Sequence, residues 1–162
     1  MAQNNIRSET ESDWNAIGEI HRLAFGRPAE AKLVEDLRQS DNVVISLVAE
    51  RGHRIIGHVL FSKLEAPMKA LGLAPLAVNS SFQKQGVGSL LIREGLCQAK
   101  DDGWISIFVL GDPAYYGRFG FRVETAKGYS SPYSGDHFMA VSFSDVPKTG
   151  QIVYPKPFKL LD

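Results

Sequence analysis

The most informative stretch of this sequence reads Leu76-Ala77-Val78-Asn79-Ser80-Ser81-Phe82-Gln83-Lys84-Gln85-Gly86-Val87-Gly88-Ser89-Leu90-Leu91. The stretch begins with the last residues of an apolar run, Leu71–Val78, which predicts a strand. The glycine-containing turn before Ser89 predicts the start of a helix. The first turn of a helix has unpaired N–H groups and a partial positive charge, so it binds phosphate groups. Gly86 and Gly88 let the backbone approach an anion, while Lys84 adds a positive charge and Ser89 a hydroxyl. The segment therefore predicts a strand, loop and helix that hold a phosphate.

Two better known phosphate motifs fit this spacing poorly. A P-loop closes on Gly-Lys-Ser/Thr, whereas Gly88 is followed by Ser89-Leu90. A dinucleotide fingerprint has its first glycine directly after the strand and a third small residue where this chain has Leu91. By itself, a Gly-x-Gly before a helix is also compatible with an ordinary strand-to-helix turn.

Composition places the chain among ordinary globular proteins. Its 162 residues are 44% apolar and 22% charged, so we expect a single domain over residues 1–162. Lys plus Arg and Asp plus Glu each number 18, and this balance gives no general attraction to nucleic acid or to an anionic membrane.

Targeting signals are also missing from the sequence. The first residues lack an apolar signal core, and no apolar run approaches the roughly 20 residues of a membrane span. The single cysteine, Cys97, excludes an intrachain disulfide and fits a reducing compartment. We expect a cytoplasmic protein that binds neither nucleic acid nor membrane.

The periodicity of the chain predicts a mixed α/β fold with an antiparallel front half and one parallel crossover through a long helix. A first strand is expected near Ile6. The first helix begins after Ser12 or Asp13, with Trp14, Ile17, Ile20 and Ala24 on its apolar side, and the second has Leu33, Val34 and Leu37. The remaining elements are expected as the strands Val43–Glu50, Ile55–Phe61 and Leu71–Val78, a helix over 86–102, the strand Ile105–Leu110, a short helix over 114–119, and the strand Phe138–Phe143.

Several motifs in this order resemble one known family. Gln83-Lys84-Gln85-Gly86-Val87-Gly88 resembles the Gln/Arg-x-x-Gly-x-Gly/Ala signature of the GNAT N-acetyltransferase superfamily. Tyr116-Gly117-Arg118-Phe119-Gly120-Phe121 resembles its Tyr-x-x-x-Gly-Phe, and the run from Phe108 to Tyr116 is similar to the YhbS-like branch. The resemblance extends from Ile6 to Phe143. One departure is Gly111-Asp112-Pro113-Ala114, which replaces the asparagine-led helix that usual members have before the tyrosine.

The resemblance implies a GNAT-like fold, with a central mixed and mostly antiparallel sheet flanked by helices. In this family the central strand and the next one splay apart, and the pantetheine arm of acetyl-CoA pairs with the exposed strand edge. The main chain of Leu76 and Val78 would then contact pantetheine, and residues 83–89 would hold the pyrophosphate. The residues expected to bind acetyl-CoA are Leu76, Ala77, Val78, Gln83, Lys84, Gln85, Gly86, Val87, Gly88, Ser89, Asp112 and Tyr116.

The implied reaction is transfer of an acetyl group from acetyl-CoA to a primary amine by direct attack. The backbone N–H of Leu76 is the candidate oxyanion donor. Tyr116 is the candidate general acid, because a phenol with a pKa of about 10 is protonated at neutral pH; the alternative is a packed aromatic residue. Glu65 is a tentative base, and its alternative is a solvated carboxylate at a loop start.

The acceptor half of the site is much less specified. The fold suggests walls from Phe25–Glu30, from residues 65–68 and from residues 129–133, with Tyr129 and Tyr133 as aromatic candidates. Nothing in the sequence specifies whether the acceptor is a small amine, an antibiotic, an amino acid or a protein lysine, and we expect a small amine or a peptide. His21, His53, His58 and His137 lack metal-type spacing, so we expect no metal, and Cys97 is expected to be a buried, inert thiol.

Two other functions compete with catalysis. The chain is alternatively a non-catalytic acyl-CoA-binding regulatory module, which Tyr116 argues against, or an interaction protein that uses the fold as a scaffold. Members of the family are often dimers, so the resemblance also suggests a homodimer, although no segment defines a subunit interface.

Overall fold

The computed structural model describes residues 3–162 and has a six-stranded sheet in the order β1-β2-β3-β4-β5-β7. Its neighbours pair antiparallel except β4 and β5, which are parallel, so the expected mixed and mostly antiparallel sheet is confirmed. A separate parallel pair joins β6 and β8. The strands are β1 (Asn5–Ser8), β2 (Val43–Arg51), β3 (Arg54–Leu64), β4 (Ala70–Val78), β5 (Ser106–Leu110), β6 (Tyr129–Ser130), β7 (Phe138–Ser142) and β8 (Gly150–Gln151). Residues 1 and 2 of the expected domain lie outside the described residues.

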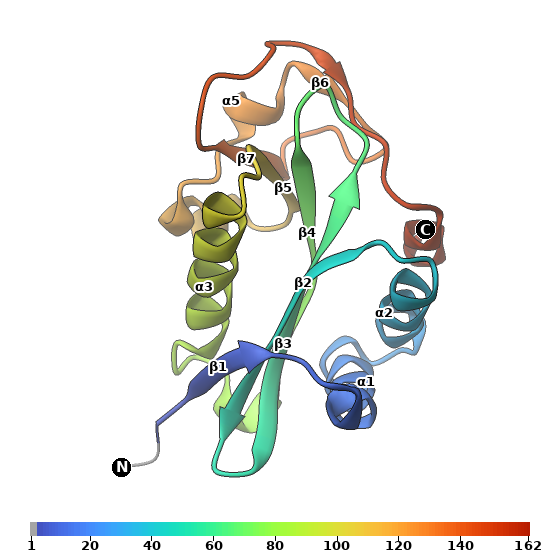
Figure 1. The fold of residues 1–162 in the computed structure, drawn as a ribbon, viewed down its shortest axis with the longest axis vertical. Coiled ribbons are helices and arrows are strands. Elements are labelled where there is room, and N and C mark those ends of the chain that lie inside the picture. Colours follow the sequence, from blue (N-terminus) through green and yellow to red (C-terminus); the bar gives the residue numbers. More distant parts are fainter. Residues whose placement is uncertain (1–2) are drawn as a thin grey trace.

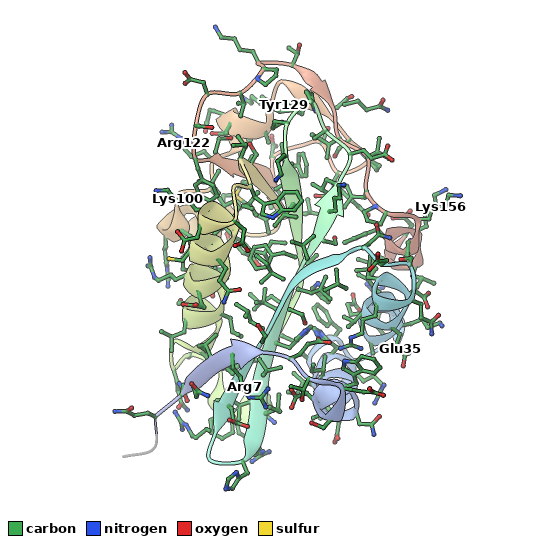
Figure 2. All side chains as sticks on the ribbon, viewed as in Figure 1. Arg7, Glu35, Lys100, Arg122, Tyr129 and Lys156 are labelled. Atoms are coloured by element: carbon green, nitrogen blue, oxygen red, sulfur yellow. The ribbon has the colours of Figure 1, made fainter. Side chains whose placement is uncertain are left out.

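Helices cover both faces of the sheet. Figure 1 shows α3 on one side, with α1, α2 and a C-terminal helical segment on the other. The α-helices are α1 (Trp14–Phe25), α2 (Ala29–Gln39), α3 (Val87–Asp101), α4 (Pro113–Tyr116) and α5 (Val123–Ala126), and the 3-10 helices are Glu11–Asp13, Ser80–Phe82, Gly117–Phe119 and Lys156–Leu161. Figure 2 shows side chains filling the space between sheet and helices, whereas Glu35, Lys100 and Lys156 lie on the outside.

The strands are apolar on both faces because each face has its own core. In β3, Val59 and Phe61 belong to the cluster that packs under α3, while Leu60 between them belongs to the cluster under α1 and α2. This is the period of two that a strand imposes on its side chains. A Cβ at Gly95 of α3 would lie 2.3 Å from the Phe61 ring, so the glycine lets α3 sit close to the sheet.

A bulge and a separation of strands open the sheet near its centre. Val59 pairs with Leu76 and Phe61 with Leu73, so the two residues Ala74 and Pro75 of β4 lie opposite Leu60 alone. Such a bulge bends its strand. Beyond it, β4 no longer pairs with β5, since their ladder joins only Ala70–Gly72 to Ser106–Phe108. The C-terminal half of β4 therefore has an edge that β5 does not cover.

The structure corrects two expectations about which side chains are buried. On α1 the buried residues are Ile17, Ile20 and His21, while Trp14 and Ala24 are exposed. The Trp14 indole instead donates to Glu9 Oε2 at 2.7 Å, outside the core. Cys97 is also exposed, because it lies two residues after the buried Gly95 and hence on the opposite side of α3.

A buried polar network fastens α1 to the sheet. His21 Nε2 lies 2.8 Å from His58 Nδ1, and His58 Nε2 lies 2.8 Å from Ser46 Oγ and 3.4 Å from Glu9 Oε1. Burial lowers the pKa of both imidazoles. Burial opposes ionisation of Glu9, but hydrogen bonds from His58, Arg38 and Ser46 outweigh it and lower the pKa of that carboxyl. The network therefore favours neutral imidazoles at His21 and His58 beside an ionised carboxylate at Glu9. His53 and His137 are exposed.

Candidate functional site

Two cavities share Leu76 in their linings, on the part of β4 that β5 does not cover. We name the first the loop cavity; it measures about 550 Å³ and is lined by Leu76, Ala77, Val78, Phe82, Gln83, Lys84, Gly86, Val87, Gly88, Ser89, Tyr115 and Arg118. We name the second the aromatic cavity; it measures about 240 Å³ and is lined by Phe25, Glu30, Leu73, Ala74, Pro75, Leu76, Leu110, Tyr116, Tyr133, Tyr154, Phe158 and Leu161. A molecule that passes Leu76 would thus extend from one cavity into the other.

The loop between β4 and α3 leaves the start of that helix open. Lys84 and Gly86 both have left-handed backbone, with φ of 63° and 85°, and the glycine takes this conformation without a steric penalty. Gly86 is the N-cap of α3 and supplies no capping side chain, and Leu90 N–H makes the first helical bond, to Gly86 O at 3.1 Å. The N–H groups of residues 87–89 therefore have no intrahelical partner and suit an anion.

Gly88 brings an aromatic hydroxyl against this first turn. A Cβ at position 88 would lie 2.9 Å from the Tyr115 hydroxyl oxygen, so a glycine is needed for the close approach. The Arg118 guanidinium lies over the Tyr115 ring, 5.5 Å from its centroid. Lys84 and Arg118 are the charged residues in the lining of the loop cavity, and both are positive. Backbone donors and these two cations fit a ligand that carries several phosphate charges.

The Tyr116 side chain faces the aromatic cavity from the end of α4. Its ring packs edge-on against Tyr115 at 5.1 Å and Phe121 at 5.8 Å between centroids. Burial, helped by the neighbouring Tyr115, raises the pKa of Tyr116 to about 12. The phenol is therefore protonated at neutral pH and available as a proton donor. Packing and donation are compatible here, because the ring packs and the residue still reaches the cavity.

Comparison with known proteins agrees with this geometry. The model of the acetyltransferase (GNAT) family matches residues 14–121. The chain belongs to the GNAT acetyltransferase family. It is 38% identical over 122 residues to the uncharacterized N-acetyltransferase YhbS of Escherichia coli K12, with 73% of each chain covered. It is 37% identical over 132 residues to YjhQ of the same strain, covering 76% of this chain and 72% of YjhQ.

Solved GNAT structures have the same architecture. The crystal structure of E. coli YhbS in complex with CoA has a TM-score of 0.91 at 32% identity, covering 98% of this chain and 93% of YhbS. A GNAT family acetyltransferase of Brucella melitensis in complex with acetyl-CoA has a TM-score of 0.84 at 30% identity, covering 96% and 98% of the two chains. The expected GNAT fold and the similarity to YhbS are confirmed.

Most residues predicted to bind acetyl-CoA gather in the loop cavity of this GNAT domain. They are Leu76, Ala77, Val78, Gln83, Lys84, Gly86, Val87, Gly88 and Ser89. Three others lie elsewhere. Gln85 is exposed and donates to Ser81 O at 3.3 Å. The Asp112 carboxylate accepts from Ala114 N–H at 3.0 Å and caps α4, so the departure from the family pattern serves as a helix cap. Tyr116 lines the aromatic cavity instead.

The predicted acceptor walls are only partly brought together. Phe25, Glu30 and Tyr133 line the aromatic cavity, whereas residues 65–68 do not. Glu65 is exposed, and its backbone pairs with Val153 at 2.9 and 3.0 Å, which directs that segment toward the C-terminal part of the chain. Glu65 is thus absent from the lining of the cavity that Tyr116 lines. Tyr129 is buried against Phe108 and donates to Pro147 O, so it is a core residue rather than a cavity wall.

Several lining residues were missed by sequence reasoning. Phe82, Tyr115 and Arg118 join the loop cavity. Tyr115 directly precedes Tyr116 and Arg118 lies inside the Tyr-x-x-x-Gly-Phe motif, so their place in the family motifs was an available signal. Tyr154, Phe158 and Leu161 form a wall of the aromatic cavity from a segment that carried no prediction. Their spacing is helical, but Pro155 and Pro157 interrupt the pattern and conceal it.

Two further observations concern residues 3–162. No helix there combines the length and hydrophobicity needed to cross a membrane. Within the same range, no three His, Cys, Asp or Glu side chains gather as metal ligands would.

Proposed function

We propose that this protein transfers an acetyl group from acetyl-CoA to a primary amine of an acceptor, which is a small amine or a peptide. The observation that carries the proposal is that the two cavities share Leu76, with phosphate-binding features in one and the Tyr116 side chain in the other. Membership of the GNAT family supports acyl transfer, and the relatives solved with CoA and acetyl-CoA support the choice of donor. The proposed location is the cytoplasm.

The proposed reaction is direct attack of the acceptor nitrogen on the thioester carbonyl carbon. A C–N bond forms, the C–S bond breaks, and the departing thiolate takes the Tyr116 phenol proton. The amine loses its own proton to solvent, and the phenolate is reprotonated from solvent. The backbone N–H of Leu76 is the proposed donor to the carbonyl oxygen, because a fixed donor in a site shielded from water stabilises developing charge most strongly. Of the lining residues, Leu76 alone belongs to both cavities.

The aromatic cavity contains one carboxylate that is a candidate base. Glu65 lies outside the aromatic cavity, and the carboxylate in the lining is Glu30. Neutral amine is present at a low but usable level near neutral pH, so the reaction proceeds without a dedicated base if the acceptor is bound in the right geometry. A homodimer stays a prediction, which sedimentation or size exclusion checks.

Calorimetry with acetyl-CoA and a thiol-release screen against amines, amino acids and peptides test the proposal together. We expect saturable binding of acetyl-CoA and acceptor-dependent release of free CoA. Absence of binding at millimolar acetyl-CoA would remove the enzyme hypothesis. Binding without turnover for any acceptor would instead favour the non-catalytic acyl-CoA-binding module.

A further inference from the structure

Resting on the proposed function, we propose that the acceptor is a compact organic cation, a small primary amine whose ring or branched hydrocarbon body fills the aromatic cavity. Peptides and protein lysines are not its substrates. The size, the wall chemistry and the charge of that cavity each favour this class of acceptor.

The size of the aromatic cavity favours a small ligand. Its volume is about 240 Å³. An apolar cavity of about 150 Å³ holds benzene, and pockets for drug-sized ligands start near roughly 300 Å³. A ring with a short aminoalkyl arm matches this space. One wall is the C-terminal 3-10 helix, whose Phe158 is buried in the core with Leu33 and Leu37 of α2. The wall is thus held in place by core packing, so the cavity keeps its small volume.

The walls are aromatic and form a connected surface. Tyr133 and Tyr154 pack edge to face with centroids 4.8 Å apart, and Tyr154 packs on Phe158 in the same manner at 5.0 Å. Phe25 and Tyr116 add rings from α1 and α4. Aromatic faces attract a cation that comes within about 6 Å of the ring centroid. Such walls therefore bind both the hydrocarbon body of an amine and its positive end.

The charge of the cavity also favours a cation. Glu30 is the one charged residue of the lining, and its side chain is only 6% exposed. Arg27 pairs with it from outside the lining, with Nη2–Oε2 at 2.6 Å and Nε–Oε1 at 3.0 Å. Burial raises the pKa of Tyr133 and Tyr154, so these phenols stay neutral and Glu30 alone gives the lining its negative charge. An acceptor ammonium would share that carboxylate with Arg27, whose side chain is half exposed.

Calorimetry on the CoA-saturated protein tests this with 2-phenylethylamine and its uncharged counterpart 2-phenylethanol. We expect the amine to bind about tenfold or more tightly than the alcohol, as a charge-assisted contact with Glu30 requires. Glu30→Gln should remove most of this difference. Arg27→Gln should increase amine affinity by roughly two- to fivefold, because an exposed competing cation is lost. Binding of acetyl-CoA should not change in either variant.

The two substitutions act in opposite directions on one ligand, which separates the proposed contact from a general loss of structure. If Glu30→Gln fails to fold, the pair of ligands and Arg27→Gln still decide. Equal affinity for amine and alcohol, or weaker amine binding in Arg27→Gln, would overturn the inference. So would a lysine peptide acetylated with a higher kcat/KM than 2-phenylethylamine, although the proposed function would then stand. Failure of acetyl-CoA to bind would overturn the proposed function itself.

Discussion

The loop cavity and the aromatic cavity share Leu76 but are built in opposite ways. The loop cavity takes most of its lining from the continuous run Leu76–Ser89, and it carries Lys84 and Arg118. The aromatic cavity collects side chains from Phe25 to Leu161, and its charged residue is Glu30. Backbone and positive charge dominate one side, whereas rings and a carboxylate dominate the other.

The difference suggests that one cavity recognises its ligand mainly through the backbone and the other mainly through side chains. A polar ligand held by main-chain N–H groups tolerates most changes of side chain, provided that the backbone keeps its path. Where side chains enclose the ligand, replacing those side chains changes which ligand is bound and how tightly. We therefore expect substitutions in the two cavities to affect different ligands and different kinetic constants.

The largest effect is expected for Tyr116→Phe. Loss of the phenol proton should lower kcat roughly 100-fold, because general acids contribute about 10²- to 10⁴-fold, while affinity for acetyl-CoA stays unchanged. Steady-state kinetics and calorimetry measure the two quantities. Tyr115→Phe is the matched control, since Tyr115 lines the loop cavity and not the aromatic one. Full turnover in Tyr116→Phe would show that Tyr116 is a packed aromatic residue and not the general acid.

The next largest effect is expected for Gly88→Ala, which tests whether the loop cavity binds acetyl-CoA through its backbone or through its side chains. The added methyl of Gly88→Ala would meet the Tyr115 hydroxyl at 2.9 Å, so the ring or the helix start must move. We expect affinity for acetyl-CoA to fall about tenfold, which corresponds to about 1.4 kcal/mol, with little change in amine binding. Ser89→Ala, which trims a side chain on the same turn, should have a much smaller effect. Similar losses in both variants would contradict recognition through the backbone.

Acidification should weaken the aromatic side before the loop side. Phe25 of the aromatic cavity stacks on His21 at 6.0 Å, and His21 contacts His58. Burial lowers the folded-state pKa of both histidines, so the unfolded chain binds more protons and stability falls as pH drops below about 6.5. The slope reaches about 1.4 kcal/mol per pH unit for each histidine.

Thermal unfolding and ligand titrations across this pH range measure the effect. His21→Gln should flatten the pH profile of stability, whereas His53→Gln, at an exposed position, should leave it unchanged. Amine binding is expected to weaken at a higher pH than acetyl-CoA binding does. Parallel loss of both would mean that the two cavities are not independent.

The smallest effect is expected for Glu65→Gln. This carboxylate is exposed and lies outside both linings, so we expect kcat to change by less than about twofold. The pH profile of kcat/KM provides a second measure. A large loss of turnover, together with loss of the acidic limb of that profile, would establish Glu65 as the general base. The acceptor site would then extend beyond the lining of the aromatic cavity.

Local pattern in the sequence was enough for the order of the elements and for most of the loop cavity. The alternation in β3, the period of α3 and the glycines at positions 86 and 88 are short-range features that act within a few residues of the chain. Residues that line a cavity from one continuous segment can likewise be predicted from the local sequence. The sequence alone therefore determined most of the lining of the loop cavity. The GNAT fold was predicted from the resemblance of the motifs to that family.

Only the tertiary structure decided the aromatic side. The separation of β4 from β5 begins after Gly72 and is followed by a bulge at Ala74 and Pro75, which is defined by pairing with β3. Tyr154, Phe158 and Leu161 reach the cavity because their segment packs on α2, more than a hundred residues earlier in the chain. Contacts between distant segments follow from packing and chain closure rather than from local periodicity, so the walls of the aromatic cavity were visible only in the folded molecule.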